Sequence, residues 1–347
     1  MKSKKFRANL ITYAIVIAAF IACQAMISTG VMTRSLKGQL VPICAYIVMA
    51  ISLNLTVGIS GELSLGHAGF MSVGAFSGIV MSMWLSKGMG LDNKTVVLLA
   101  AIITGGVAAG IAGVLIGIPV LRLRGDYLAI VTLAFGEIIR NVINCLYISL
   151  DGSKLHVAFN NPNVAGKLLI NGPAGATGVS KIATFGMGFA LVLFTLFVVL
   201  NLIDSRSGRA IMAIRDNRIA AEAMGLNVTK YKMMAFVTSA VLAGMAGALY
   251  GLNFSTVAAS KFKFDTSILV LVFVVLGGIG NIRGSIISAT LLTILPELLR
   301  AFANYRMLIY AIVLILVMLA TNNPTLRSMV QRIVPQKRGN KKEADEA

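Results

Sequence analysis

The chain has 347 residues, of which 57% are hydrophobic and 13% are charged. A soluble globular domain has about 25% charged residues, so this composition excludes an ordinary soluble protein and indicates an integral membrane protein. The net charge of +18 does not indicate a nucleic-acid partner, because the basic residues lie at the ends of apolar runs and in loops, where membrane topology explains them.

The hydrophobic residues form continuous runs, many of which approach or exceed the roughly 20 residues that a transmembrane helix needs. A β-barrel would require alternating hydrophobicity, so the sequence predicts an all-α polytopic membrane protein with eight to ten transmembrane helices. We expect one transmembrane domain over residues 1–325, beginning with an uncleaved helix, and a charged cytoplasmic tail over 326–347. The predicted spans are residues 9–28, 39–57, 68–86, 95–118, 127–150, 182–203, 232–252, 266–282, 285–302 and 307–321.

Residues 58–70 (GISGELSLGHAGF) are too polar for an ordinary transmembrane turn. They predict a broken helix or a re-entrant element, which is tolerated at membrane depth only where protein or a water-filled cavity surrounds it. Glu62 and His67 could form a proton relay. We favour a structural or pathway-lining role, because glycine-rich bends often need a polar side chain to hold backbone groups.

The predicted fifth span contains two charged residues, Glu137 and Arg140. Charges at this depth are costly unless they are paired, and the i, i+3 spacing lets these two side chains pair with each other. The loop that follows, residues 151–181, is rich in Asn, Gly and Pro, which favour turns. We expect this long loop to be extracytoplasmic and to meet a partner or cap a pathway.

Residues 204–230 form a basic segment between two long apolar runs, with four arginines from Arg206 to Arg218. Arginine is costly in hydrocarbon, and the distribution of the 31 Lys and Arg residues places this segment and both termini in the cytoplasm. We predict one uninterrupted helix from Ser207 to Gly225, with Ser205 or Ser207 as its N-cap and Gly225 as its stop. Asn227 or Thr229 is predicted to cap the next helix.

The predicted helix has one polar stripe, Arg215, Arg218 and Glu222, at i, i+3 and i+7. Another surface, which fits a shallow groove, is formed by Ala220, Ala221, Ala223 and Met224. An amphipathic helix can also lie on a lipid surface, but an alanine-rich face would bind lipid weakly, so we favour a protein partner. The candidate docking residues are Arg215, Arg218, Ala220, Ala221, Glu222, Ala223 and Gly225.

The run AAEAMGLN (220–227) resembles the EAA-type loop of ABC importer permeases, which fits a cleft in the ATPase subunit. The wider runs 208–251, 53–76 and 122–140 resemble LivM-type permeases of branched-chain amino acid importers. Together the similar runs cover most of residues 50–290, while the tail (NNPTLRSM) departs from the FRPxGL-like ending of the family.

The resemblance implies a type II-like permease of the bacterial inner membrane, with no enzyme activity or cofactor of its own. It also implies a second related permease, two ATPase subunits that bind ATP, and an extracytoplasmic binding protein for leucine, isoleucine or valine. The chain itself contains no GxxxxGK[ST] motif. Under this resemblance Glu137 and Arg140 either meet the charged ends of a zwitterionic amino acid or lock helix packing.

Two further functions stay open at the level of sequence. An ion-coupled secondary amino-acid transporter would need inverted repeats and a coupling-ion site in the membrane; no clear repeat occurs, and only Glu62, His67, Glu137 and Arg140 could form such a site. An ABC permease for another small amide or amino acid, such as urea, would share the same sequence features. No catalytic constellation or metal-ligand spacing occurs.

Overall fold

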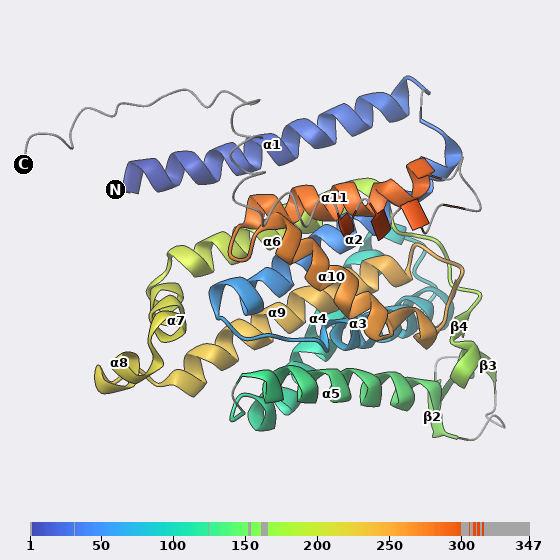
Figure 1. Cartoon of the computed structure of the whole chain (residues 1–347). Coiled ribbons are helices and arrows are strands. Elements are labelled where there is room, and N and C mark those ends of the chain that lie inside the picture. Colours follow the sequence, from blue (N-terminus) through green and yellow to red (C-terminus); the bar gives the residue numbers. More distant parts are fainter. Residues whose placement is uncertain are drawn as a thin grey trace, which may run out of the picture. The chain divides into compact units, whose positions relative to one another are not determined.

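The computed structural model describes residues 2–30, 32–123, 125–151, 154–160 and 166–299, with a few single residues between 305 and 315. It divides into residues 1–294 and residues 295–347, and the description below concerns the first unit (Figure 1). The helices are α1 (Lys2–Ser28), α2 (Arg34–Asn54), α3 (His67–Met83), α4 (Lys94–Val120), α5 (Asp126–Asn144), α6 (Phe185–Asp204), α7 (Arg206–Asp216), α8 (Arg218–Ala223), α9 (Val228–Gly251), α10 (Phe264–Gly277) and α11 (Ile282–Leu298).

Glycine residues let α3, α4 and α9 pack with their backbones in contact. Gly74 of α3 and Gly105 of α4 both lie against Gly244 of α9, where a Cβ atom would overlap the facing helix. Small residues allow this close approach between transmembrane helices. Beside these helices, α2 is almost completely buried, and π-helical turns extend α2 to Ile59 and α3 to Gly88.

Six helices in the described residues are long and apolar enough to cross a membrane: α1 from Leu10, α2 with its extension, α3 with its extension, α4, α6 and α9. The other predicted spans within the described residues correspond to α5, α10 and α11. The predicted span 127–150 is too long, since α5 ends at Asn144. The span predicted at 307–321 lies mostly outside the described residues, and the tail 326–347 lies wholly outside them.

A small antiparallel sheet interrupts the helical fold, and the sequence did not predict it. Its strands are β1 (Leu146–Asp151), β2 (Lys154–Phe159), β3 (Lys167–Asn171), β4 (Ala176–Thr177) and β5 (Thr256–Val257), in the order β2-β1-β3-β4-β5. The segment 151–181, predicted as a turn-rich loop, therefore contains strands, and one of them, β4, pairs with β5 in the chain after α9. In Figure 1 the sheet and the α7–α8 region lie at opposite ends of this unit.

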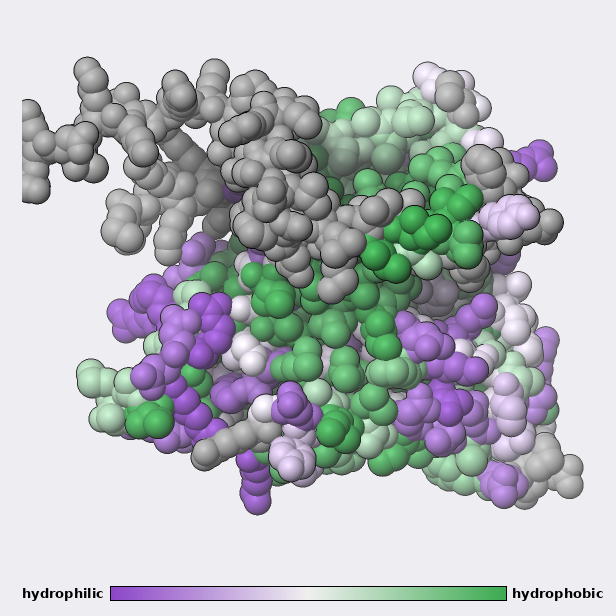
Figure 2. Space-filling view, in the orientation of Figure 1, coloured by the Kyte–Doolittle hydropathy of each residue, from purple (hydrophilic) through white to green (hydrophobic). Residues whose placement is uncertain are grey.

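The distribution of side chains agrees with a membrane protein. On the face in Figure 2, apolar side chains cover the middle, and polar ones gather towards the end with α7 and α8 and the end with the sheet. The outer face of α4 has an exposed apolar stripe at helical spacing: Leu99, Ile103, Val107, Ile111 and Leu115. Such a stripe is typical of a helix that contacts lipid or another transmembrane chain.

A tight turn joins α10 to α11. Gly278 and Gly280 have φ values of +89° and +83°, and Gly277 lies directly against Gly284. Residues 277–284 therefore combine close glycine packing with a turn. Asn54 at the end of α2 holds this turn, because its side chain accepts a hydrogen bond from Gly280 N at 2.8 Å.

Candidate functional site

The polar stretch between α6 and α9, the α6–α9 loop, folds as two short helices, α7 and α8. The uninterrupted helix predicted from Ser207 to Gly225 is therefore wrong at Asn217, where φ is −151° and ψ is 103°. The Asn217 side-chain oxygen accepts a hydrogen bond from Ala220 N at 3.0 Å. Asparagine competes with helical backbone bonds in this way and favours the N-cap position, so a new helix begins after it.

The ends of this loop are capped as the sequence predicted. Ser205 caps α7 and Asn227 caps α9, and each side chain accepts a hydrogen bond at 3.0 Å from the backbone N–H three residues on. Gly225 has a φ of +78°, and the N–H groups of Gly225 and Leu226 donate to carbonyl groups of α8 at 3.0 and 3.1 Å. This Schellman arrangement ends α8 sharply.

The outer face of α8 differs from the predicted alanine surface. Ala221 is only 5% exposed and packs with Ile214 and Val228 inside the loop, so its side chain does not lie on the outer face of α8. The most exposed apolar side chains are Ile219 and Met224, at 80% and 83%. Ile219 was not among the predicted docking residues, although its i, i+4 spacing to Ala223 puts both on one face of a helix. The predicted docking residues that are exposed on α8 are Ala220, Glu222 and Ala223, followed by Gly225.

Arg215 does not contact the same residues as Arg218 and Glu222, which pair with each other. Arg218 Nε and Glu222 Oε1 are 2.8 Å apart, which makes an i, i+4 ion pair on α8. Arg215 ends α7 instead, and its Nη1 donates a hydrogen bond of 2.9 Å to the carbonyl of Gly58. The predicted single stripe of these three residues is therefore wrong, because the break between α7 and α8 turns Arg215 towards the end of α2.

Residues 60–66 form an irregular, non-helical connection between the π-helical end of α2 and the start of α3. We call residues 58–66 the linker segment. Gly61, with a φ of +74°, lies against the Arg215 side chain, where a Cβ would be crowded. The predicted break in the helix is thus confirmed, whereas a re-entrant course stays a prediction.

A second basic residue, just after the α6–α9 loop, also contacts the linker segment. Lys232, in the first turns of α9, forms an ion pair with Glu62, and the two side chains are only 12% and 11% exposed. Ion pairs with so little solvent around them are costly to break, because the remaining charge loses its partner. Arg215 and Lys232 therefore connect the end of α7 and the start of α9 to the linker segment.

His67 begins α3 and is buried in a polar network. Its Nε2 lies 2.8 Å from Ser52 Oγ, while Ser239 Oγ of α9 donates to the Ser52 carbonyl at 2.5 Å. The next residue of α3, Ala68, donates its N–H to Ser267 Oγ of α10 at 3.0 Å. These contacts join α2, α3, α9 and α10, which supports the structural interpretation of His67 over a proton relay.

Two buried hydroxyl groups near the linker segment lack partners in the part of the chain that the structure describes. They are Thr56 Oγ1 and Ser64 Oγ, in residues that are 2% and 1% exposed. A buried polar group without a hydrogen bond costs about 1–3 kcal/mol. The hydrogen-bonding capacity of buried groups around the linker segment is thus used less completely than in a rigid protein core.

Glu137 and Arg140 of α5 pair with each other, as their spacing predicted. Arg140 Nε and Nη2 both lie 2.7 Å from Glu137 Oε2, and the side chains are 33% and 22% exposed. Glu137 also lines a narrow crevice between α3, α5 and α10. One turn earlier, Thr132 Oγ1 accepts a hydrogen bond from Leu65 N at 3.0 Å, so α5 holds the end of the linker segment.

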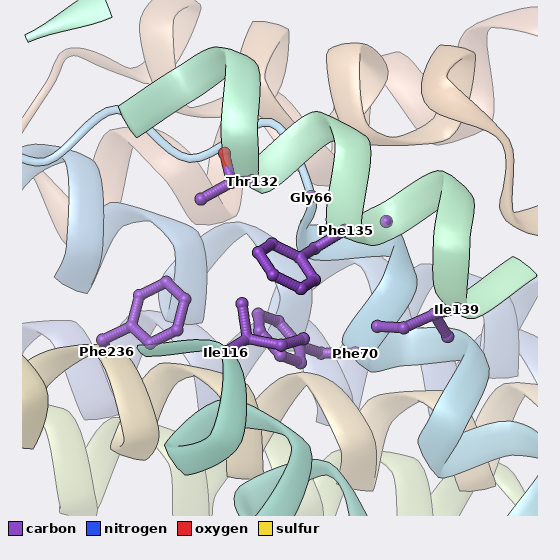
Figure 3. Close-up of a pocket in the computed structure, with 8 residues that line it drawn as sticks. Gly66, Phe70, Ile116, Thr132, Phe135, Ile139 and Phe236 are labelled. Atoms are coloured by element: carbon purple, nitrogen blue, oxygen red, sulfur yellow. The ribbon is translucent and has the colours of Figure 1, made fainter. Parts of the chain in front are cut away.

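A second crevice near the same part of α5 is apolar (Figure 3). The Phe135 ring lies at its centre beside Phe70, and Ile116 and Phe236 close it. No group of three or more His, Cys, Asp or Glu residues that could hold a metal ion occurs among the described residues.

The comparison with known families decides the assignment. The family described as "Branched-chain amino acid transport system / permease component" matches residues 35–318. The chain belongs to this family. The matched range includes the linker segment, α5, the α6–α9 loop and α10, which are the elements with candidate functional residues.

The similar proteins include permeases named LivM and permeases named LivH. The high-affinity branched-chain amino acid transport system permease protein LivM of Salmonella typhimurium is 34% identical over 308 residues, which is 79% of this chain and 66% of LivM. LivM of Escherichia coli K12 has the same identity and coverage. LivH of Salmonella typhimurium is 26% identical over 280 residues, which is 79% of this chain and 88% of LivH.

The chain thus spans slightly less than two thirds of the length of these LivM proteins. No solved structure matches it significantly.

Proposed function

We propose that this chain is a permease subunit of an ATP-driven importer for branched-chain amino acids, and that α8 docks on a separate ATPase subunit. The observation that most supports this proposal is the construction of the α6–α9 loop. It presents two exposed apolar side chains, Ile219 on α8 and Met224 at its end. Arg215 of this loop and Lys232 at the start of α9 contact the linker segment.

The exposed face of α8 is suited to a protein partner. Ile219 and Met224 are large, apolar and almost fully exposed at the end of the unit opposite the sheet. Burial of such side chains at an interface contributes much of the binding energy. The loop is basic, so the positive-inside rule supports a cytoplasmic location, and the ATPase must be another polypeptide because this chain has no P-loop.

The loop also has a route by which movement of α8 would reach the membrane. The ion pair of Lys232 with Glu62 and the hydrogen bond of Arg215 to Gly58 connect α9 and α7 to the linker segment. The linker segment in turn contacts α5 through Leu65. Binding and release of ATP by the ATPase would therefore alter the packing of α3 and α5 and open the pathway alternately to either side.

The partners and substrate follow from the named relatives. Relatives called LivM and LivH are both branched-chain amino acid permeases, so we propose a heterodimer of this chain with a second, related permease. An extracytoplasmic binding protein would deliver leucine, isoleucine or valine to the end with the sheet. The multi-pass protein would lie in the bacterial inner membrane with both termini in the cytoplasm.

The docking proposal is tested in vesicles with the complete importer. The variant Ile219→Asp with Met224→Asp should lose ATPase co-purification and ATP-driven leucine uptake, since two apolar interface residues contribute about 2 kcal/mol or more. The matched control is Met89→Asp, which changes an exposed methionine (58%) outside this loop. Normal ATPase retention and uptake in the double variant would refute docking through α8.

The transport proposal has its own test. Wild-type vesicles should accumulate leucine with internal ATP and continue to do so when ionophores remove ion gradients. Uptake that needs an ion gradient and not ATP would favour the secondary transporter instead. Competition of leucine uptake by isoleucine, valine, alanine and urea would then establish the substrate class.

A further inference from the structure

A long apolar groove lies between α3, α4 and the sheet. Its volume is about 400 Å³, which is within the range of roughly 300–1,000 Å³ for small-molecule pockets. One wall follows a stripe of α3 and its π-helical end, formed by Val73, Phe76, Ser77, Val80, Met81 and Trp84. At 1.5 Å per residue this stripe is about 16 Å long. The strands β1, β2 and β3 contribute Leu146, Ile148, Leu155 and Ile170.

The groove is suited to hydrocarbon. Among the described residues that line it, none is charged. The hydroxyl groups of Ser77 and Thr104 donate to carbonyls of their own helices, at 2.6 Å and 2.9 Å. A charged ligand such as an amino acid would lose water here without gaining partners, which is costly. A long, narrow groove also suits an unbranched chain better than a helix, which is about 10 Å across.

The apolar surface continues from the groove onto the edge of the sheet. Leu155, Val157 and Phe159 of β2 alternate with polar or small residues, so they share one face of the strand. Leu155 lines the groove, which identifies this face as the groove side. The three side chains are 40%, 59% and 64% exposed. An exposed apolar face of this kind marks contact with a membrane or a partner.

Two lysines come together at the end of the groove that contains Trp84. Lys87 follows Trp84 by three residues in the π-helical end of α3, and Lys167 lies opposite Leu150 of β1, on the groove side of the sheet. Both lysines are exposed, and their positive charges are close enough to act on each other. Among the described residues neither forms an ion pair. An anion beside both would offset their repulsion.

We propose that this groove binds an anionic phospholipid, with one acyl chain along α3 and the phosphate of the headgroup beside Lys87 and Lys167. Trp84 would then lie at the membrane interface, where tryptophan is enriched. Lysines near a membrane surface attract anionic lipids, which explains why the apolar groove ends at two of them. The inference does not depend on the proposed substrate or on the ATPase, because it needs only a chain that lies in a membrane.

The single tryptophan of the chain provides the test. Trp84 lines the groove, so its fluorescence reports on the ligand there. The full chain is reconstituted in phosphatidylcholine vesicles with increasing fractions of phosphatidylglycerol that has brominated acyl chains, which quench tryptophan on contact. Quenching should be half complete at a mole fraction roughly 25-fold lower than with brominated phosphatidylcholine, about fivefold for each lysine. Equal curves for the two lipids would overturn the proposal.

Lysine variants test the place of the headgroup. Lys87→Gln with Lys167→Gln should bring the phosphatidylglycerol curve to the phosphatidylcholine curve. The matched control is Lys154→Gln, which removes the same charge from β2, next to Leu155 and therefore on the other face of the sheet. Its curve should stay within about twofold of wild type if the charge near the groove decides the preference. A preference that survives in the double variant would contradict this assignment.

Filling the groove tests the place of the acyl chain. Ser77→Phe adds a ring to the middle of the groove wall and should remove the quenching that saturates at low lipid fractions, whereas Ser77→Ala keeps the space and should not. Thermal stability in detergent shows that both variants are folded. Unchanged quenching in Ser77→Phe would place the chain elsewhere. A wild-type Trp84 that neither brominated lipid quenches would mean that protein covers the groove, and would also refute the proposal.

Discussion

The α3–α4–α9 core and the linker segment are neighbours built in opposite ways. In the core, glycines bring the backbones of three helices into contact, and Gly244 alone touches two of them. In the linker segment, the contacts are polar: an ion pair through Glu62 and a hydrogen bond from Arg215 to a backbone carbonyl. Two buried hydroxyl groups there and nearby have no partner among the residues that the structure describes.

This difference indicates which part moves. Close-packed backbones have no alternative arrangement of similar energy, because a small shift produces overlap. Hydrogen bonds and ion pairs can instead be exchanged for others, and unsatisfied groups lower the cost of such an exchange. We therefore expect the core to act as a fixed frame and the linker segment to change position during transport.

The largest effect is expected when a side chain is placed inside the core. Gly244→Leu would push Gly105 and Ala109 of α4 away from α9, so the protein should be destabilised by more than about 3 kcal/mol and should not accumulate in the membrane. Expression and thermal stability in detergent measure this. The control is Gly186→Leu, because no atom lies within 4 Å of a Cβ at that helical position; equal loss in both variants would argue against a rigid core.

A smaller effect on stability, but a large one on transport, is expected at Lys232. Lys232→Met leaves Glu62 without its ion-pair partner and should cost about 1–3 kcal/mol. Uptake should fall much more than expression, while the ATPase subunit still co-purifies. The exchanged pair, Glu62→Lys with Lys232→Glu, should recover most of the uptake. Equal losses of uptake and of folded protein in Lys232→Met would show that the pair only stabilises the fold.

The sequence predicted the features that depend on residue type and local spacing. The caps at Ser205 and Asn227 and the pairing of Glu137 with Arg140 follow from short-range rules that tertiary contacts did not overrule. The irregular backbone near Glu62 was predictable for the same reason, since glycines and charges are unfavourable in a continuous transmembrane helix.

The features that could not be predicted from the sequence depend on contacts between distant residues. Ala221 is buried because Ile214 and Val228 pack against it. A single helix drawn over residues 207–225 could not predict this contact, because Val228 lies outside that range and the helix is broken at Asn217. The strand pairs of β1 with β3 and β4 with β5 join residues far apart in the chain, so turn-forming residues alone indicated a loop. The contacts of Arg215 and Lys232 with the linker segment span more than 150 residues and left no local signal.

A moderate effect is expected at Arg215, which contacts the linker segment from a half-exposed position. Arg215→Ala removes the hydrogen bond to the Gly58 carbonyl and an exposed ion pair with Asp216. Exposed ion pairs contribute little, so the stability should change by no more than about 1.5 kcal/mol. Uptake should nevertheless fall by about fivefold or more, the usual range for a coupling contact between two sites. Arg209→Ala is the control, because this exposed arginine of the same helix donates a hydrogen bond to the carbonyl of Asp204, at the end of α6. Similar uptake in both variants would remove Arg215 from the proposed route.

The smallest effect is expected at Gly225, where only backbone conformation is involved. Gly225→Ala meets no atom within 4 Å, but its φ of +78° costs a residue with a Cβ about 1–2 kcal/mol. The end of α8 should therefore fray, and hydrogen exchange of α8 should become faster. Gly90→Ala is matched in strain, with a φ of +65° and no atom within 4 Å, but lies between α3 and α4. If docking depends on an ordered α8, Gly225→Ala weakens ATPase binding and Gly90→Ala does not, whereas equal binding by both would mean that the partner itself orders the end of this helix.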